Sequence, residues 1–184
     1  MTTITRARQG GARTWIYLIA CQGGWFACVL SAAAGHAEVG MAFALAVACI
    51  HIWCARRPAS EMRLVAVVTA LGWIWDSAVA RSGLLVYPNG VWIAGTAPYW
   101  MAGLWMLFAV QLNTLFRWLR SRTLTAIVFG GAGGPLAYRA GAALHAVQFS
   151  HTATAIVTLA AGWAVLFPSF VTLAARWDGM TSPR

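Results

Sequence analysis

Residues 153–175 read ATAIVTLAAGWAVLFPSFVTLAA, a run without a charged side chain that ends at Arg176. The hydrocarbon core of a bilayer is about 30 Å thick, and a helix needs about 20 residues to cross it. A soluble protein would have to expose part of so long a run to water. The run is therefore typical of a helix that crosses a membrane.

Five further apolar stretches precede this one along the chain. We expect membrane crossings at about residues 15–34, 39–54, 64–80, 98–116, 124–144 and 153–175. The stretches are continuous and lack the period-two alternation of a barrel wall, so the predicted fold class is all-α. Six crossings leave room only for short loops, which predicts a single six-helix membrane domain over residues 1–184, a polytopic transmembrane bundle.

All 13 cationic side chains are arginines, and their positions predict the orientation of the bundle. Eleven of them lie before the first stretch, between the second and third, between the fourth and fifth, or after the sixth. These are Arg6, Arg8, Arg13, Arg56, Arg57, Arg63, Arg117, Arg120, Arg122, Arg176 and Arg184. Positively charged loops stay in the cytoplasm, so we expect both the N-terminus and the C-terminus there.

The net charge of +9 also bears on the partners of the protein. Basic residues that border apolar stretches favour attraction to anionic membrane lipids, and nucleic acid is not expected. A membrane protein partner or a homo-oligomer stays possible. The first stretch also resembles a secretory signal, because small residues follow it at Ala32, Ala33 and Ala34, and its cleavage is left open.

Asp76 is the strongest candidate for a functional residue. An ionisable group within a crossing is costly in hydrocarbon and usually faces the bundle interior or a wet cavity. Arg139 lies on the fifth stretch at a similar distance from the outer edge, so the two side chains could pair. Asp76 serves equally well as a structural residue that holds the third helix to the fifth, and Arg139 as an interfacial residue that reaches the head groups.

Four polar side chains lie at a similar depth in the half nearer the cytoplasm. They are Gln22, His51, Gln111 and Asn113, from the first, second and fourth stretches. We expect them to meet in one polar layer and to contribute to binding, with hydrogen bonds between helices as the simpler role.

No metal or cofactor is expected. Cys49 and Cys54 flank His51, but residues five apart do not share a helix face, so their spacing does not suit a metal site. His51 and His145 lie toward opposite sides of the membrane, which disfavours a haem held between them. The chain has no lysine that could carry a retinal or pyridoxal Schiff base.

Glycines cluster in the fifth stretch. Gly130 and Gly134 have the GxxxG spacing that lets two helices approach closely, and Gly134 with Pro135 favours a kink or a break. Broken helices line many substrate sites, although close packing alone explains these glycines.

Several short motifs resemble one known family. The first stretch carries GWFACVL at residues 24–30, the third carries Asp76, the fourth carries WMLFA at residues 105–109 followed by Asn113, and the fifth carries GGPLAY at residues 133–138. Together they look like a bacterial inner-membrane family known as domain of unknown function 2878. The resemblance implies no catalytic residue. It implies a link to membrane lipid metabolism or envelope stress, because members are often encoded near cyclopropane-fatty-acid-synthase-like and other lipid-modifying genes.

We therefore expect an accessory or lipid-binding protein of the bacterial inner membrane. One alternative is a small transporter or a substrate-binding membrane subunit, with a cavity lined by Trp73, Trp75, Trp92 and Trp100 and open to the outside. The second is an intramembrane lipid-modifying enzyme, which requires Asp76 within hydrogen-bonding reach of a histidine. Catalysis is the less favoured outcome. An enzyme would have to rely on Asp76, His51, His145 or His151, and Asp76 is the candidate catalytic residue.

The predicted topology can be tested with reporter fusions. Fusions at Asn89 and directly after His151 should report the periplasm, and a fusion at Ser60 should report the cytoplasm, because the arginine-rich segments are retained inside. A periplasmic signal from the Ser60 fusion would refute the orientation.

Overall fold

The computed structural model of the chain describes residues 2–181 and contains six α-helices in that range. They are α1 (Thr2–Ala33), α2 (Ala37–Trp53), α3 (Pro58–Arg81), α4 (Tyr99–Leu112), α5 (Thr123–Ala143) and α6 (Thr152–Arg176). A short 3-10 helix, η1 (Arg117–Ser121), follows α4. Strands β1 (Leu85–Val86) and β2 (Gln148–Phe149) pair antiparallel at the opposite end of the bundle. The all-α prediction is confirmed.

Three helix boundaries differ from the expected ones by several residues. α1 begins at Thr2 instead of near Trp15. α3 begins at Pro58 instead of near Leu64, because a proline is well placed in the first turn of a helix, where its missing N–H is not needed. α4 ends at Leu112, and the chain turns at Asn113 into η1, whereas the sequence predicted a helix as far as Phe116. The earlier start of α3 places Glu61 inside a helix.

Three helical segments are both long and apolar enough to cross a membrane: Arg13–Ala33 of α1, all of α3 and all of α6. α2 and α4 are apolar but shorter. α5 has 21 residues and runs unbroken through Pro135, so the break considered at Gly134 and Pro135 is absent. These helices are those of a membrane protein.

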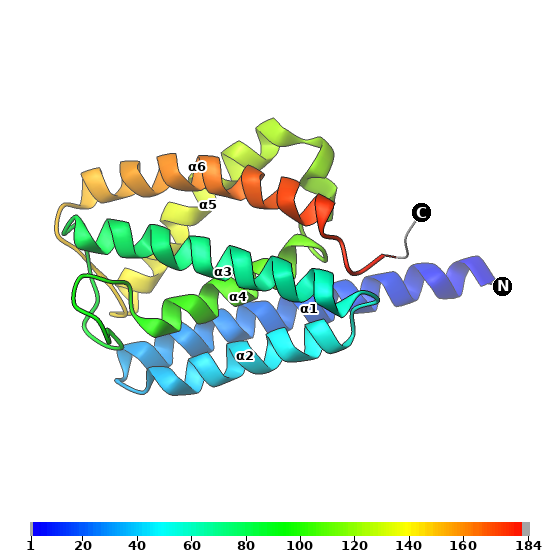
Figure 1. Cartoon of the computed structure of the whole chain (residues 1–184), viewed down its shortest axis with the longest axis horizontal. Helices are drawn as coiled ribbons and strands as arrows, with labels where there is room; N and C mark the ends of the chain where they lie inside the picture. Colours follow the sequence, from blue (N-terminus) through cyan, green and yellow to red (C-terminus); the bar gives the residue numbers. More distant parts are fainter. Residues whose placement is uncertain (1, 182–184) are drawn as a thin grey trace.

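The helices form three layers (Figure 1). α3 and α4 lie between the α1–α2 pair and the α5–α6 pair. α1 and α2 pack closely on each other and on α4, and α5 packs along α6. The α5–α6 pair is joined to the rest of the protein mainly through contacts of α6 with η1, α3 and α4. This leaves α1 and α5 facing each other without close packing.

Glycines allow the helices to approach at several of these contacts. A Cβ on Gly40 would lie 2.3 Å from the backbone of Cys28, so α1 and α2 touch there with no side chain between them. A Cβ on Gly72 would lie 2.0 Å from the Trp105 ring, and one on Gly130 would lie 2.4 Å from the carbonyl oxygen of Trp163. The expectation that the glycines of the fifth helix serve close packing is thus met at Gly130.

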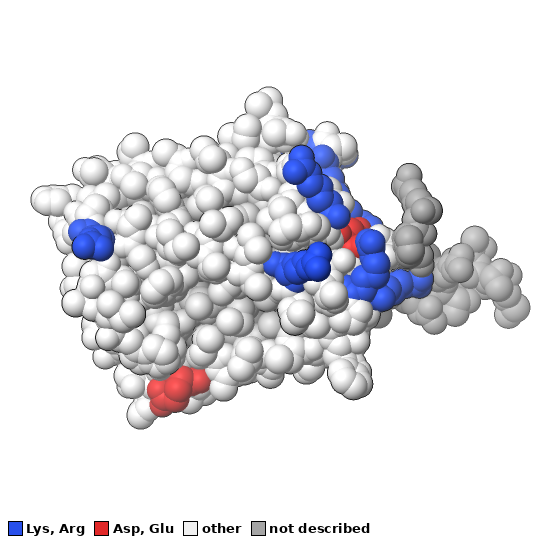
Figure 2. All heavy atoms as spheres, viewed as in Figure 1, with Lys and Arg blue, Asp and Glu red and all other residues white. Residues whose placement is uncertain are grey.

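Arginines gather at one end of the bundle, the end from which both termini emerge (Figure 2). This end is formed by the C-termini of α2 and α6, the N-termini of α3 and α5, and η1. On the face seen in Figure 2, a broad surface without charged groups separates it from the other end, where Arg81 closes α3. Arg184 lies outside the described residues, and the side chains of Arg6 and Arg8 are not described.

Because Trp105 packs directly against Gly72, one added methyl group at Gly72 should lower the stability of the protein. We expect Gly72→Ala to destabilise the protein by about 1–3 kcal/mol, because the methyl group overpacks the contact between α3 and α4. The matched control is Gly23→Ala, since Gly23 has nothing within 4 Å and lies on the surface of α1. Melting temperatures of the detergent-solubilised variants measure both effects. Equal melting temperatures would contradict the tight contact.

Candidate functional site

A buried polar cluster lies near the arginine-rich end and is centred on Glu61. The Glu61 side chain is fully buried in the first turn of α3. Its Oε2 lies 3.0 Å from Nε2 of His51 on α2, and Nδ1 of His51 lies 3.1 Å from the hydroxyl of Tyr17 on α1. With Nε2 donating to the carboxylate, Nδ1 is free to accept from the tyrosine. The cluster therefore links three helices.

The second carboxylate oxygen of Glu61 binds the segments that follow α4 and α6. Oε1 accepts hydrogen bonds from Nδ2 of Asn113 at 2.7 Å and from the backbone N–H of Gly179 at 2.8 Å. The side-chain oxygen of Asn113 in turn accepts from Arg120. A buried carboxylate needs such donors, because burial without them costs several kcal/mol.

Asp178 fixes the segment that follows α6. Its carboxylate accepts from Arg117 and, at 2.9 Å, from Arg120, both on η1. Its second oxygen accepts from the backbone N–H of Met180 at 2.9 Å, and Arg57 donates to its carbonyl. Burial by itself raises the pKa of Asp178, but the hydrogen bonds from Arg120 and Met180 outweigh it and hold the pKa below its ordinary value.

The expected polar layer is divided in two by the structure. His51 and Asn113 do meet, through Glu61, which lies before the third stretch expected at residues 64–80. Gln22 and Gln111 lie elsewhere and line a cavity. The signal that could have placed Glu61 is Pro58, since a helix that begins there carries Glu61 in its first turn.

Asp76 is fully buried on α3, and its partners are two aromatic side chains. Oδ2 accepts from Nε1 of Trp105 at 2.7 Å, and Oδ1 accepts from the hydroxyl of Tyr138. The pairing of Asp76 with Arg139 does not occur: Arg139 is exposed, and no ion pair among the described residues joins the two. Asp76 does hold α3 to α5, but through Tyr138, the residue before Arg139.

Trp105 and Trp163 form a stacked pair between α4 and α6. Their ring centroids lie 4.8 Å apart and their planes differ by 10°. Gly72 makes room for Trp105, and Gly134 makes room for Trp163, because a Cβ on Gly134 would lie 2.3 Å from that ring. With its N–H turned to Asp76, Trp105 presents only the apolar surface of its ring to the space beside it.

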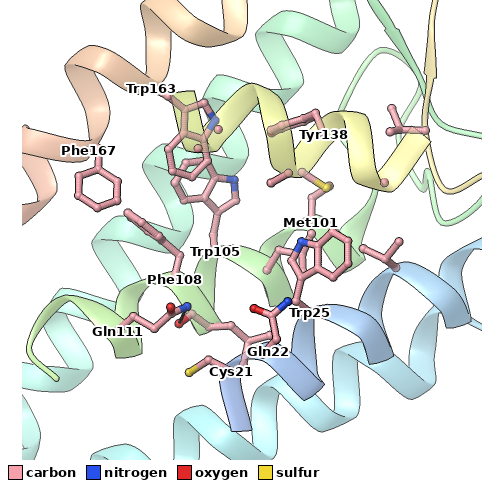
Figure 3. Close-up of a pocket in the computed structure, with 18 of the residues that line it drawn as sticks. Cys21, Gln22, Trp25, Met101, Trp105, Phe108, Gln111, Tyr138, Trp163 and Phe167 are labelled. Atoms are coloured by element: carbon pink, nitrogen blue, oxygen red, sulfur yellow. Dashed lines mark hydrogen bonds between the residues drawn. The ribbon is translucent and has the colours of Figure 1, made fainter. Parts of the chain in front are cut away.

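This stacked pair forms part of the wall of a cavity of about 340 Å³ between α1, α4, α5 and α6 (Figure 3). Much of the lining is aromatic: Trp25, Tyr87, Trp100, Trp105, Phe108, Phe116, Phe129, Tyr138, Trp163 and Phe167. Gln22 and Gln111 lie on the side of the cavity away from Tyr138 (Figure 3). No arginine, histidine, aspartate or glutamate is among the described residues that line it.

The cavity continues toward the surface between α1 and α5. A shallower hollow there shares Gln22, Trp25 and Ala137 with the cavity. Its remaining lining residues are Phe26, Ala140, Ala143 and Leu144. Phe26 and the three alanines are exposed on the flank of the bundle. The opening thus faces sideways, where a bilayer would surround the helices.

This geometry gives little support to the two alternative functions, an intramembrane enzyme and a small transporter. The enzyme hypothesis needs a histidine at Asp76, but His51 binds Tyr17 and Glu61, and His145 and His151 are exposed. For the transporter hypothesis, Trp100 lines the main cavity, whereas Trp73 and Trp92 line a separate outer groove. Sequence reasoning missed the partners Trp105 and Tyr138, although both fall within the quoted motifs.

The lowered pKa of Asp178 predicts a pH-dependent contribution to stability. Folding favours the ionised carboxylate, so the contribution is present above an ordinary aspartate pKa of about 3.9 and is lost as the pH falls through the lower pKa of the folded state. We expect Asp178→Asn to destabilise the protein by on the order of 1–3 kcal/mol at pH 7 and by less at pH 3. Thermal unfolding at both pH values measures this.

Glu38→Gln is the matched control, because Glu38 is exposed and its ion pair with His36 spans 3.6 Å. This variant should unfold like the wild type at both pH values. An Asp178→Asn protein with the same deficit at pH 3 and pH 7 would show that the charge of Asp178 does not matter.

Comparison with known proteins gives one match. No curated protein and no solved structure matches the chain. A family model described as "Protein of unknown function (DUF2878)" matches residues 14–169, a range that includes the cavity and the Asp76 contacts but ends before Asp178. The chain therefore belongs to this family, whose description assigns no function.

Proposed function

We propose that this protein binds a membrane lipid and serves as an accessory protein of the bacterial inner membrane. The observation that carries the proposal is the apolar cavity that opens sideways between α1 and α5. Protein interiors are packed densely and hold few voids larger than a water molecule. A void of about 340 Å³ falls within the range of small-molecule sites, so it suits part of a lipid chain.

The chemistry of the lining favours a chain from the bilayer over a water-soluble ligand. Aromatic rings supply large apolar surfaces and prefer close contact with other apolar groups. Most of this lining offers water no hydrogen bond, and its polar groups belong to a few side chains, among them Gln22 and Gln111. A lipid chain that moves sideways from the membrane meets no charged group along this path among the described lining residues.

The surroundings fit the same proposal. In the orientation we propose, all six helices cross the membrane, and the arginine-rich end lies in the cytoplasm together with both termini. There the arginines contact anionic head groups, each at a gain of about 1 kcal/mol. A role in membrane lipid metabolism or envelope stress follows from lipid binding as the simplest cellular setting.

Filling the cavity should remove the lipid. Gly133 lines the cavity, and a Cβ built on it has nothing within 4 Å. We expect Gly133→Leu to fold normally and to reduce the lipid that copurifies with the protein by about fivefold, roughly the effect of 1 kcal/mol. Native mass spectrometry and lipid extraction, with bulk membrane lipids as the reference, measure this.

The matched control is Gly23→Leu, because Gly23 is equally open but lies outside the cavity on α1. Both variants replace a helical glycine by leucine, so a general effect of helix propensity or surface hydrophobicity appears in both. Equal lipid content in the two variants, or a copurified lipid mixture identical to the bulk membrane, would refute the proposal.

A further inference from the structure

We infer that the lipid has an uncharged polar group, a hydroxyl or carbonyl, which binds the side-chain amides of Gln22 and Gln111. This inference rests on the proposed function and names the class of ligand. It depends on three properties of the cavity: the absence of charge in its described lining, the free hydrogen-bonding capacity of the two amides, and their depth along the helices.

Charged groups near the cavity are turned away from it or hidden. Arg139 is exposed on α5 and does not line the cavity. Asp76 lies behind the rings of Trp105 and Tyr138, and both of these use their polar hydrogens on its carboxylate. A phosphate or carboxylate inside the cavity would lose its water without gaining a counter-charge, which is strongly unfavourable.

Gln22 has a side chain that needs a partner. It is exposed on the flank of α1, where it lines both the cavity and the sideways opening, and no hydrogen bond joins its amide to another described residue. In hydrocarbon, an unpaired amide is costly because no water can take the place of the missing partner. A polar group on the ligand supplies that partner.

Gln111 completes the pair. Its Nε2 donates to the carbonyl oxygen of Leu107 at 3.0 Å, which leaves its Oε1 as a free acceptor. Figure 3 shows the two amides on the same side of the cavity, directed toward one another in this view. An amide offers donors and an acceptor, so a hydroxyl group, which can both donate and accept, matches the pair.

The depth of Gln22 separates this ligand from an ordinary phospholipid. Gln22 lies two helical turns beyond Trp15, or about 10 Å along the axis of α1. Trp15 is exposed at a position that suits the membrane interface. A polar group held at Gln22 therefore lies within the hydrocarbon, below the head groups, which suits a long-chain alcohol, ester or ketone.

Three photoreactive probes with the same 16-carbon chain test the inference in the full-length protein, reconstituted into phosphatidylcholine vesicles. They are diazirine derivatives of hexadecane, hexadecanol and hexadecyl phosphate, and peptide mass spectrometry locates the labelled residues. We expect hexadecanol to label cavity residues about fivefold more than hexadecyl phosphate does. In Gln22→Leu, hexadecanol labelling should fall about fivefold, the effect of one neutral hydrogen bond, while hexadecane labelling stays the same.

Gln148→Leu is the control, because Gln148 is exposed on β2 and lies outside the cavity. Equal labelling by hexadecyl phosphate and hexadecanol, or an unchanged preference for hexadecanol in Gln22→Leu, overturns the inference while hexadecane in the cavity still supports lipid binding. If neither hexadecane nor hexadecanol labels cavity residues, the proposed function itself fails, and the inference fails with it.

Discussion

The indole of Trp105 is the group on which the rest of the structure depends. Its N–H binds the buried carboxylate of Asp76 on α3, its ring fits against Gly72, and its face stacks on Trp163 of α6. One side chain of α4 thus holds α4 to α3 within the middle layer and joins that layer to the α5–α6 layer. Because α6 is the main link between the α5–α6 pair and the other helices, this contact also positions the wall of the cavity.

Among the described residues, the buried carboxylates lie in two places, and none of them lines the cavity. At the arginine-rich end, Glu61 and Asp178 accept hydrogen bonds from side-chain and backbone donors. Farther along α3, Asp76 accepts hydrogen bonds from the two aromatic side chains Trp105 and Tyr138. Each carboxylate stays buried because its donors replace the lost water. The same contacts keep carboxylates out of the described cavity lining, which is why the site suits a neutral ligand.

Much of the fold could be predicted from the sequence, because the length of an apolar run and the position of arginines are local properties. Contacts between helices are not local. Asp76 was expected to meet Arg139 and instead meets Tyr138, one residue earlier, because a single step along a helix turns the side chain by about 100°. Glu61 was missed for a related reason: α3 begins earlier than its apolar run does, at Pro58.

The sideways opening follows from the unequal packing of α5. Gly134 lets Trp163 of α6 approach on one face, while its neighbour Gly133 has open space at the cavity. α1 packs against α2 and α4 and not closely against α5, so a gap stays between α1 and α5. In a bilayer, such a gap would face hydrocarbon, where apolar surface is not exposed to water. The lipid that we propose as the ligand would enter the cavity by this gap.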